Sequence, residues 1–245
     1  MQPFSVSISI LMLVSESNRT GVTARYISER SGLPLSTVYR WIDTLLGERL
    51  IVRHPRTRKL HLGDIAFMLG VQAVARPFVP PAVEEALQPL ATSLGCRIHF
   101  VRRGGDYAVM QRTYFENLEM AQARRSRVAV MRLLGIGPAG LCLLAGLEDY
   151  ELERFLVRNL KDLHAAGLDE VQIRARVWNT RTQGYAITNS ALTPGFQALA
   201  VGLGLNGRAY SVSAAFPEKI GRPQFEKIRR ALVAACQSIQ DTAGQ

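Results

Sequence analysis

The stretch of sequence that decides the fold runs from Gly32 to Leu45 and reads GLPLSTVYRWIDTL. Proline is a favoured first residue of a helix, so Pro34 predicts a helix over residues 34–46. The opposite side of this helix carries short polar groups and one arginine, which suits a helix that enters the major groove of DNA. Its apolar residues recur at the spacing of a helix with one buried side, and they are Val38, Trp41, Ile42 and Leu45.

The neighbouring sequence predicts that this helix belongs to a winged helix-turn-helix. Apolar spacing over 6–14 predicts a first helix, and residues 23–31 form a second one that ends at the turn residue Gly32. Two short apolar runs, 50–52 and 60–62, flank a basic tip and predict a β-hairpin. Two helices joined by a glycine-containing turn and followed by such a wing form a DNA-binding unit. A further helix is expected from 64 to about 75, with Ile65, Met68, Leu69 and Gln72 along one stripe.

The residue types on the outer side of the third helix and on the wing fit contacts with DNA. Hydroxyl groups at a helix N-terminus can donate to phosphate, and a long arginine can bond guanine through two atoms. Cations on the wing can neutralise flanking phosphates. An ordinary helical hairpin with a solvated basic face remains the alternative. The candidate DNA-binding residues are Ser36, Thr37, Tyr39, Arg40, Arg53, Arg56, Arg58 and Lys59.

Composition narrows the class of protein. The chain has 245 residues, a formal net charge of +10 and 47% apolar residues, so it can bury a core and should meet an anionic partner. Residues 1–76 carry ten basic and five acidic side chains, which is half of that net charge. Three distant cysteines disfavour a disulfide scaffold and fit a reducing compartment. Neither a convincing signal peptide nor a run of about 20 apolar residues is present, so we expect a cytoplasmic protein without a membrane span.

The rest of the chain predicts a second, mixed domain. The proline-rich stretch RPFVPP at 76–81 breaks any helix, so we set the domain boundary near residue 76. Strand-like and helix-like segments follow, including two adjacent hairpin signals, and predict an antiparallel-centred sheet with helices. The expected fold class is α+β, with a DNA-binding domain over 1–62, a linker helix and hinge over 63–80, and an effector-binding and oligomerisation domain over 81–245. Within it, strands are expected at 96–101, 107–113, 128–134, 184–188, 198–205 and 208–214, and helices at 83–94, 141–146, 148–159, 169–183 and 225–239.

Several ordered motifs together resemble the IclR family of bacterial transcription regulators. The stretch 32–45 is similar to the family's recognition helix, and GYA at 184–186 followed by PGFQALA at 194–200 is similar to its effector-domain signature. AYSVS at 209–213 resembles its small-residue strand, and 134–145 resembles its glycine-containing loop and helix. The resemblance covers nearly the whole chain. It implies a winged helix-turn-helix, a linker helix used in dimerisation, a GAF-like effector domain, and dimers or tetramers on operator DNA.

The resemblance also implies where a small effector would bind. A loop before a helix offers backbone N–H groups to an anion, and alternate residues of a strand share one face. Cross-strand hydrogen bonding on an exposed face is the alternative for the two serines. The implied effector residues are Ile136, Gly137, Pro138, Ala139, Thr188, Asn189, Ala198, Ser211 and Ser213.

This sequence departs from the family at that site. The acidic residues usual after the Gly-Tyr pair are replaced by TNSA at 188–191, the frequent cysteine is Ala198, and the usual histidine of the loop is Gly135. The effector therefore either differs from the small keto- and hydroxy-acids of some relatives or is absent. Eight arginines between 97 and 132 offer partners for an anionic ligand, although we expect most of them to face solvent.

The sequence gives little support for an enzymatic function. Two segments, 135–140 and 202–207, match Gly-x-Gly-x-x-Gly, but neither has the strand and acidic residue that a dinucleotide site needs. The four histidines have no metal-ligand spacing. We therefore expect neither an enzyme nor a cofactor, but a transcription regulator whose operator binding responds to a small organic, possibly anionic, effector. The alternative is a ligand-independent repressor or architectural DNA-binding protein with a degenerate sensor domain.

Overall fold

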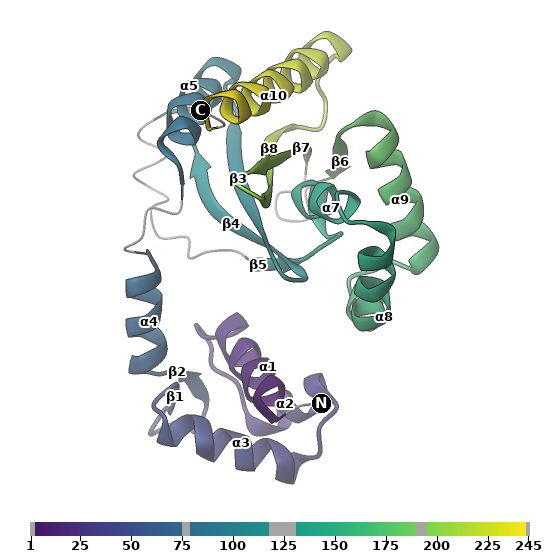
Figure 1. Ribbon diagram of the computed structural model, residues 1–245. Helices are drawn as coiled ribbons and strands as arrows, with labels where there is room; N and C mark the ends of the chain where they lie inside the picture. Colours follow the sequence, from purple (N-terminus) through teal and green to yellow (C-terminus); the bar gives the residue numbers. More distant parts are fainter. Residues whose placement is uncertain (1–2, 75–78, 118–130, 190–194, 244–245) are drawn as a thin grey trace. The chain divides into compact units, whose positions relative to one another are not determined.

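The computed structural model describes residues 3–74, 79–117, 131–189 and 195–243 (Figure 1). The chain divides into two compact units, Met1–Phe78 and Val79–Gln245. The first unit contains α1 (Pro3–Glu16), α2 (Ala24–Ser31), α3 (Leu35–Gly47), the antiparallel strands β1 (Ile51–Arg53) and β2 (Leu60–Leu62), and α4 (Asp64–Val74).

Local signals set the ends of α2 and α3. The Thr23 side chain accepts a hydrogen bond from the Tyr26 N–H at 3.2 Å, and Gly32 ends α2 at a φ of 70°. The turn therefore needs glycine, because other residues rarely adopt this conformation. Pro34 lies just before α3 rather than in its first turn, since its ψ is 141°. Its carbonyl accepts the first helical hydrogen bond, from the Val38 N–H at 3.0 Å.

The core of the first unit confirms the helical stripe of α3. Val38, Ile42 and Leu45 are buried, with exposed fractions of 0%, 0% and 3%. Trp41 is only half-buried and packs at the edge of this cluster. The core is completed from α1, α2 and the hairpin, so α3 is fixed on one side and open on the other.

Helix α4 differs from the expected amphipathic stripe. Met68 and Leu69 are 58% and 61% exposed, and Gln72 is also exposed, while Ile65 is half-buried. Phe67 at 71% and further apolar residues make α4 apolar on several sides. The helix contacts β1, and none of its residues belongs to the core cluster, so most of its length packs on no other element among the described residues of the unit.

The second unit is built around a six-stranded antiparallel sheet, in the order β5-β4-β3-β8-β7-β6. The β7–β8 connection is a two-residue turn at Asn206 and Gly207, whose φ values of 50° and 69° are those of a type I′ hairpin. This hairpin accounts for the second Gly-x-Gly-x-x-Gly match. The strands are β3 (Arg97–Gly104), β4 (Tyr107–Tyr114), β5 (Met131–Leu133), β6 (Ala186–Asn189), β7 (Phe196–Leu205) and β8 (Arg208–Pro217).

Helices cover both faces of this sheet (Figure 1). One face packs on α5 (Pro81–Leu94) and α10 (Arg222–Ala243), through residues such as Leu87 and Leu232. The other face packs on α7 (Gly137–Ala145), which is followed by α8 (Asp149–Ala165) and α9 (Glu170–Gln183). The predicted α+β class and antiparallel-centred sheet are confirmed.

Some element limits differ from the prediction. Helix α7 begins at Gly137 rather than 141, because Pro138 favours the first turn of a helix and Gly137 adopts a φ of 74°. Helix α8 continues to Ala165, six residues beyond the expected end. The strand expected over 128–134 is β5, and residues 128–130 lie outside the described part of the chain.

Candidate DNA interface and effector site

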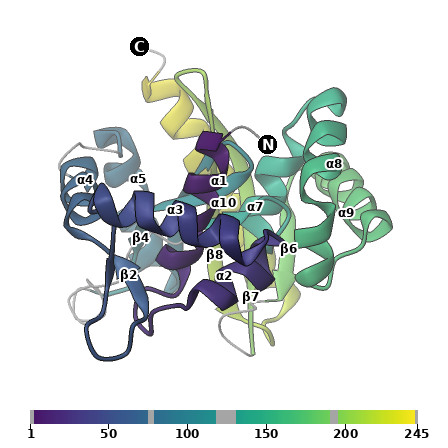
Figure 2. The same ribbon diagram turned by 90° about the horizontal axis from the view of Figure 1, so that it is seen from below.

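The outer side of α3 exposes most of the residues predicted to contact DNA. Ser36 and Arg40 are exposed, Tyr39 is 45% exposed, and Thr37 is half-buried at the first turn. Figure 2 looks onto this side of α3, with the β1–β2 hairpin at its C-terminal end. The Arg40 guanidinium lies 5.9 Å from the centre of the half-buried Trp41 ring, within the range of a cation–π contact. Helix α3 thus presents a long cation beside hydroxyl groups.

Hydrogen bonds within the wing fix the shape of its tip, and the sequence did not predict them. The ring Nδ1 of His54 accepts hydrogen bonds from the backbone N–H groups of Arg56 and Thr57, at 3.3 and 3.2 Å. No motif in the sequence marks this role of His54. Arg58 adopts a φ of 58°, which closes the tip. The tip is therefore shaped by its own backbone contacts.

The four wing cations differ in their surroundings. Arg56 and Arg58 are exposed, whereas Arg53 and Lys59 are half-buried. Lys59 Nζ donates to the Thr20 carbonyl at 3.2 Å and so ties the wing to the loop after α1. Arg56 and Arg58 are the residues most available to an external phosphate. That these residues bind DNA stays a prediction.

The sheet register brings several predicted effector residues into adjacent rows on the face that α7 covers. Thr188 lies opposite Ala198, which lies opposite Ala215, which in turn lies opposite Arg97. In the next row Ala200 lies opposite Ser213 and Ser213 opposite His99. Ala200 packs in the same cluster as α7, while the alternate residues of these strands pack against α5 and α10. The rows therefore share one face, since successive residues of a strand point to opposite sides.

Two buried hydroxyl groups on this face have no partner among the residues that the structure describes. The hydroxyl oxygens of Thr188 and Ser211 are buried and form no hydrogen bond within those ranges. Ser211 is 0% and Ser213 is 3% exposed, so the alternative of an exposed serine face is wrong. A buried hydroxyl without a partner is costly, by about 1–3 kcal/mol. Such groups are commonly satisfied by a bound water or ligand.

The remaining predicted effector residues fall into two groups. The loop and first turn of α7, residues 136–139, are half-buried and offer backbone N–H groups at the start of that helix. Asn189 instead lies at the exposed end of β6, and its side-chain oxygen accepts from Gln197 Nε2 at 3.2 Å. As a strand neighbour of Thr188, Asn189 points to the opposite face of the sheet. The structure therefore places Thr188 and the two serines on one face of the sheet, on different strands, and Asn189 on the other face.

Arg132, one of the eight arginines between 97 and 132, and His99, which the sequence did not mark as an effector residue, lie on the same face. Arg132 of β5 places Nη1 3.9 Å from the point that a Cβ on Gly137 would occupy, so its guanidinium lies beside the first turn of α7. No ion pair or hydrogen bond joins Arg132 to another residue of the described ranges. His99 Nδ1 lies 3.0 Å from the Thr113 hydroxyl, in the row of Ser213. Neither residue has a local motif that identifies it.

Electrostatics make this face cationic but keep its histidine neutral. Burial, together with smaller contributions from the positive charges of Arg97 and Arg132, lowers the pKa of His99 to about 4. Burial also lowers the pKa of Arg132. A neutral imidazole with two arginines in range gives an arrangement of donors that fits an anion, because no acidic side chain lies in the two rows around His99.

The five described arginines between 97 and 132 are partly enclosed, although none is fully buried. Arg97, Arg102, Arg103 and Arg132 are half-buried, and only Arg112 is exposed. Their long apolar stems pack along the sheet. Some of their guanidinium groups form ion pairs, Arg103 with Glu151 and Arg112 with Glu84. Arg124, Arg125 and Arg127 lie outside the described residues.

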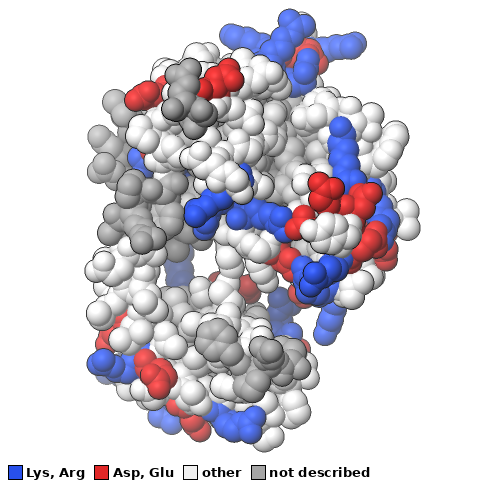
Figure 3. All heavy atoms as spheres, in the orientation of Figure 1, with Lys and Arg blue, Asp and Glu red and all other residues white. Residues whose placement is uncertain are grey.

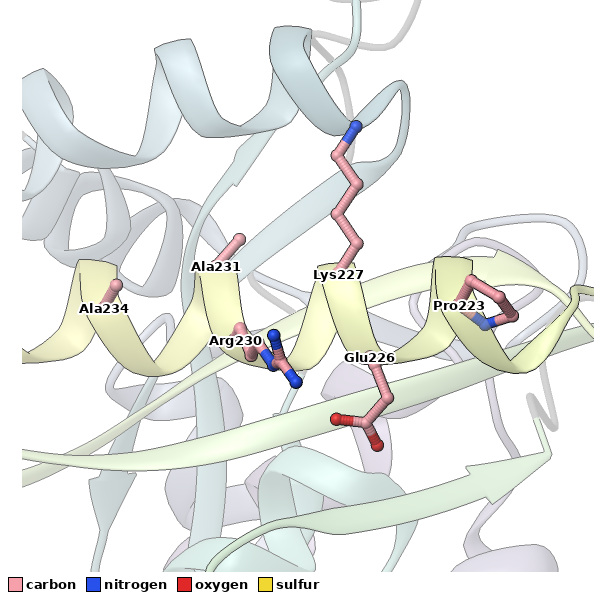
Figure 4. A pocket seen from close by; sticks show the side chains of 6 residues that line it. All are labelled: Pro223, Glu226, Lys227, Arg230, Ala231 and Ala234. Atoms are coloured by element: carbon pink, nitrogen blue, oxygen red, sulfur yellow. The ribbon is translucent and has the colours of Figure 1, made fainter.

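A surface hollow on α10 is a separate feature (Figure 4). All six residues that line it come from this one helix, from Pro223 to Ala234, and the side chains of Lys227 and Arg230 extend away from each other. A surface formed by a single helix cannot surround a small molecule, so the hollow lacks the enclosure typical of ligand sites. The α7 side of the sheet remains the candidate effector site.

The described residues lack two other kinds of feature. They contain no group of three histidine, cysteine, aspartate or glutamate side chains placed to hold a metal ion. Within the same residues, no helix is long and apolar enough to cross a membrane.

Comparisons with known proteins cover both units of the chain. Residues 5–55 match the family model described as the IclR helix-turn-helix domain. The HTH-type transcriptional regulator BhcR of Paracoccus denitrificans is 30% identical over 202 residues, which cover 79% of this chain and 69% of that protein. An IclR family transcriptional regulator from Brucella abortus has a similar structure, with a TM-score of 0.79, 16% identity, and coverage of 99% of this chain and 92% of that one. For an IclR-type regulator from Alicyclobacillus acidocaldarius the TM-score is 0.64, with 22% identity and 97% of each chain covered.

Proposed function

The chain belongs to the IclR family of DNA-binding transcription regulators, and we propose that it binds a specific operator as a dimer or tetramer under the control of a small anionic organic molecule. Helix α3 reads the major groove, with Arg40 contacting a base and Ser36 and Thr37 contacting phosphate. Regulation rather than catalysis is its function, and its place of action is the cytoplasm. An effector acts by favouring one arrangement of the two DNA-binding units of the dimer.

The exposed apolar surface of α4 supports dimerisation. Phe67, Met68 and Val71 are 71%, 58% and 49% exposed and lie within about 100° of each other around the helix. Asp64 is the only charged residue of α4 among Asp64–Val74. A helix that is apolar on most sides is stable in water only when another surface covers it. The α4 of a second copy supplies that surface in our proposal.

The observation that carries effector binding is the buried Ser211 hydroxyl, which has no hydrogen-bond partner among the described residues, on the sheet face where Arg97 and Arg132 both act on His99. The hydroxyl can donate to a carboxylate or phosphate, and Arg132 supplies a positive charge. Gly137, whose φ of 74° excludes most other residues, begins the helix whose free N–H groups lie beside Arg132. These groups favour an acidic effector over a neutral one.

We expect Arg132→Met to remove the response to that effector. Thermal unfolding of the full chain would be followed with a panel of small organic acids, including dicarboxylates and phosphorylated acids, each matched to a neutral analogue. At 100 times its dissociation constant, a ligand stabilises the folded state by about 2.7 kcal/mol. The wild type should gain this stabilisation from at least one acid, and Arg132→Met should lose most of it.

Arg112→Met is the matched control, because Arg112 is exposed and pairs with Glu84 of α5 on the other face of the sheet. An acid that stabilises Arg132→Met as strongly as the wild type would contradict the role of Arg132. If no acid stabilises the wild type while operator binding is intact, the protein is the ligand-independent regulator instead.

The wing should contribute to affinity without sequence preference. Arg56→Gln combined with Arg58→Asn removes two exposed cations, and asparagine tolerates the positive φ of residue 58. Because each neutralised phosphate contributes a slope of about −0.9, the plot of log affinity against log salt should flatten by about two. Anisotropy titrations at several salt concentrations measure the slope. Arg208→Gln with Lys227→Gln, in the second unit, should leave it unchanged, and an unchanged slope in the wing variant would exclude the wing from the interface.

A further inference from the structure

His54 is the centre of the loop between β1 and β2, which we call the wing tip. Its backbone N–H donates to the Lys59 carbonyl at 2.8 Å, and its own carbonyl accepts from the Arg58 N–H at 2.9 Å. Its ring Nδ1 accepts from the N–H groups of Arg56 and Thr57, at 3.3 and 3.2 Å. This one residue therefore joins both ends of the wing tip to its middle.

The wing tip has no unpaired backbone N–H group with which to bind DNA. Besides the bonds made through His54, the Lys59 N–H donates to the Thr57 hydroxyl oxygen at 3.4 Å, and Pro55 has no N–H. A backbone N–H that already has a partner inside the loop is not free to bond a phosphate. A phosphate beside the wing tip must therefore be bound by side chains.

The two hydrogen bonds to Nδ1 decide where the His54 ring carries its hydrogen. A ring nitrogen that accepts a hydrogen bond has no hydrogen of its own, so in the neutral ring the hydrogen is on Nε2. His54 is exposed, and its Nε2 forms no hydrogen bond with another residue of the described ranges. The ring therefore presents an N–H donor to the outside of the wing tip, and its other nitrogen holds it in place.

The second histidine of the wing has the opposite arrangement. His61 Nδ1 lies 2.8 Å from the Asn18 carbonyl oxygen, which can only accept, so the hydrogen of this ring is on Nδ1. Its Nε2 lies so close to Gly21 that a Cβ there would overlap with the ring. The two ring centres are 6.2 Å apart. His61 is thus turned towards the loop after α1, whereas His54 has its second nitrogen open to the outside.

The surroundings of His54 favour an anion. Figure 3 shows that both acidic and basic side chains reach the surface of the first unit. The stretch from Arg49 to Gly63, by contrast, contains five lysine or arginine residues and no acidic one. Arg56 and Arg58 follow His54 in the wing tip, and both are exposed. An N–H donor among cations, with no carboxylate beside it in the sequence, has the composition of a phosphate site.

We propose that His54 contacts DNA directly, with its Nε2–H donating to a phosphate oxygen while its Nδ1 holds the loop that presents Arg56 and Arg58. The same ring is a phosphate donor and a positioning residue for the two arginines. A neutral donor adds affinity without sequence preference. It releases no counterion, because it neutralises no phosphate charge. The inference rests on the proposed contact of the wing with DNA.

His54→Asn separates the two roles. Asparagine accepts N–H groups two and three residues further on, as in Asx turns and helix caps, so it keeps the wing tip closed but has no donor at the place of Nε2. Affinity for DNA from beside the protein's own gene and for a scrambled fragment should each fall by about 3- to 10-fold per DNA-binding unit. The slope of log affinity against log salt should stay at the wild-type value. Anisotropy titrations of the full chain measure both quantities.

His54→Ala removes both roles. Without Nδ1 the N–H groups of Arg56 and Thr57 lose their acceptor, so the wing tip opens and the arginines are no longer held in place. Affinity should fall further than in His54→Asn, and the salt slope should flatten. His164→Asn is the matched control, since His164 is an exposed histidine near the end of α8 in the second unit, and it should bind both fragments as the wild type does. Circular dichroism verifies that each variant is folded.

Nitrogen-15 NMR of the histidine rings tests the proposal on the wild-type chain. Spectra of the full chain labelled at histidine distinguish a ring nitrogen that carries a hydrogen from one that does not. His54 should carry its hydrogen on Nε2, and His61 should carry it on Nδ1. Addition of the fragment from beside the gene should shift the His54 Nε2 signal and slow the exchange of its hydrogen with water. The signal that disappears in His54→Asn identifies His54.

A His54→Asn variant with wild-type affinity, or a His54 Nε2 signal that DNA does not change, would overturn the phosphate contact. If Arg56→Gln with Arg58→Asn still flattens the salt slope in that case, the wing lies on DNA and only the role of His54 is wrong. If that variant also leaves the slope unchanged, the wing itself is off the DNA, and both proposals fail.

Discussion

Phe67→Glu combined with Val71→Glu should weaken operator binding by about 100-fold or more. Both side chains are exposed within the first unit, so their replacement leaves the core of that unit intact. In the proposed dimer they lie against α4 of the second copy, where buried carboxylates without partners are strongly unfavourable. Because two linked DNA-binding units gain roughly 10²–10⁴ in affinity over one, loss of the dimer removes that gain. Sedimentation and operator titration of the same samples measure both effects.

Ala73→Glu is the control for α4, because residue 73 lies on the opposite side of the helix from Phe67 and Val71. It adds a carboxylate to the same exposed helix and should leave both mass and affinity near those of the wild type. A Phe67 and Val71 variant that remains a dimer and binds operator normally would show that α4 is not the dimer interface.

Arg40→Ala should reduce operator affinity by about 1–3 kcal/mol, which is roughly 5- to 150-fold. The expected reason is loss of a two-atom contact to guanine, which only the planar guanidinium can form. Binding to random DNA should fall much less, so the preference of the protein for its operator should relax at one base pair of each half-site. Competition titrations with single-base variants of the operator locate that base pair.

Arg40→Lys separates charge from base reading. Lysine keeps the positive charge but lacks the fork of donors, so affinity for random DNA should stay near the wild-type value while operator preference falls. If Arg40→Lys retains the full operator preference, Arg40 acts only on phosphate. If Arg40→Ala binds operator and random DNA as the wild type does, α3 is not the recognition helix.

The DNA-binding unit could be predicted from sequence because its signals are local. Val38, Ile42 and Leu45 repeat at helical spacing, Gly32 stops the preceding helix, and the two short apolar runs pair as β1 and β2. Each of these features acts within one element or one turn. The packing partner of α4 could not be predicted in the same way. Its apolar residues are equally compatible with a core inside the unit and with an interface to a second copy.

The candidate effector site depended on pairings that the sequence does not display. Arg132 and His99 join Ser213 only through the order of strands in the sheet, and no motif marks either residue. The family resemblance suggested Thr188 and Asn189 together, yet strand neighbours point to opposite faces, and Asn189 lies at the exposed end of β6. The alternation of side chains along residues 186–189 therefore predicts, from sequence alone, that Asn189 does not share a face with Thr188.

Fluorescence anisotropy of the full chain with DNA from beside its own gene, compared with a scrambled fragment over a salt series, tests the central claim most directly. As a sequence-specific regulator, the protein should bind its own fragment at least about 10³-fold more tightly than the scrambled one. Affinity for both fragments should fall steeply with salt. Weak binding that does not distinguish the two fragments, with and without the acid that stabilises the protein, would contradict sequence-specific regulation and favour an architectural role.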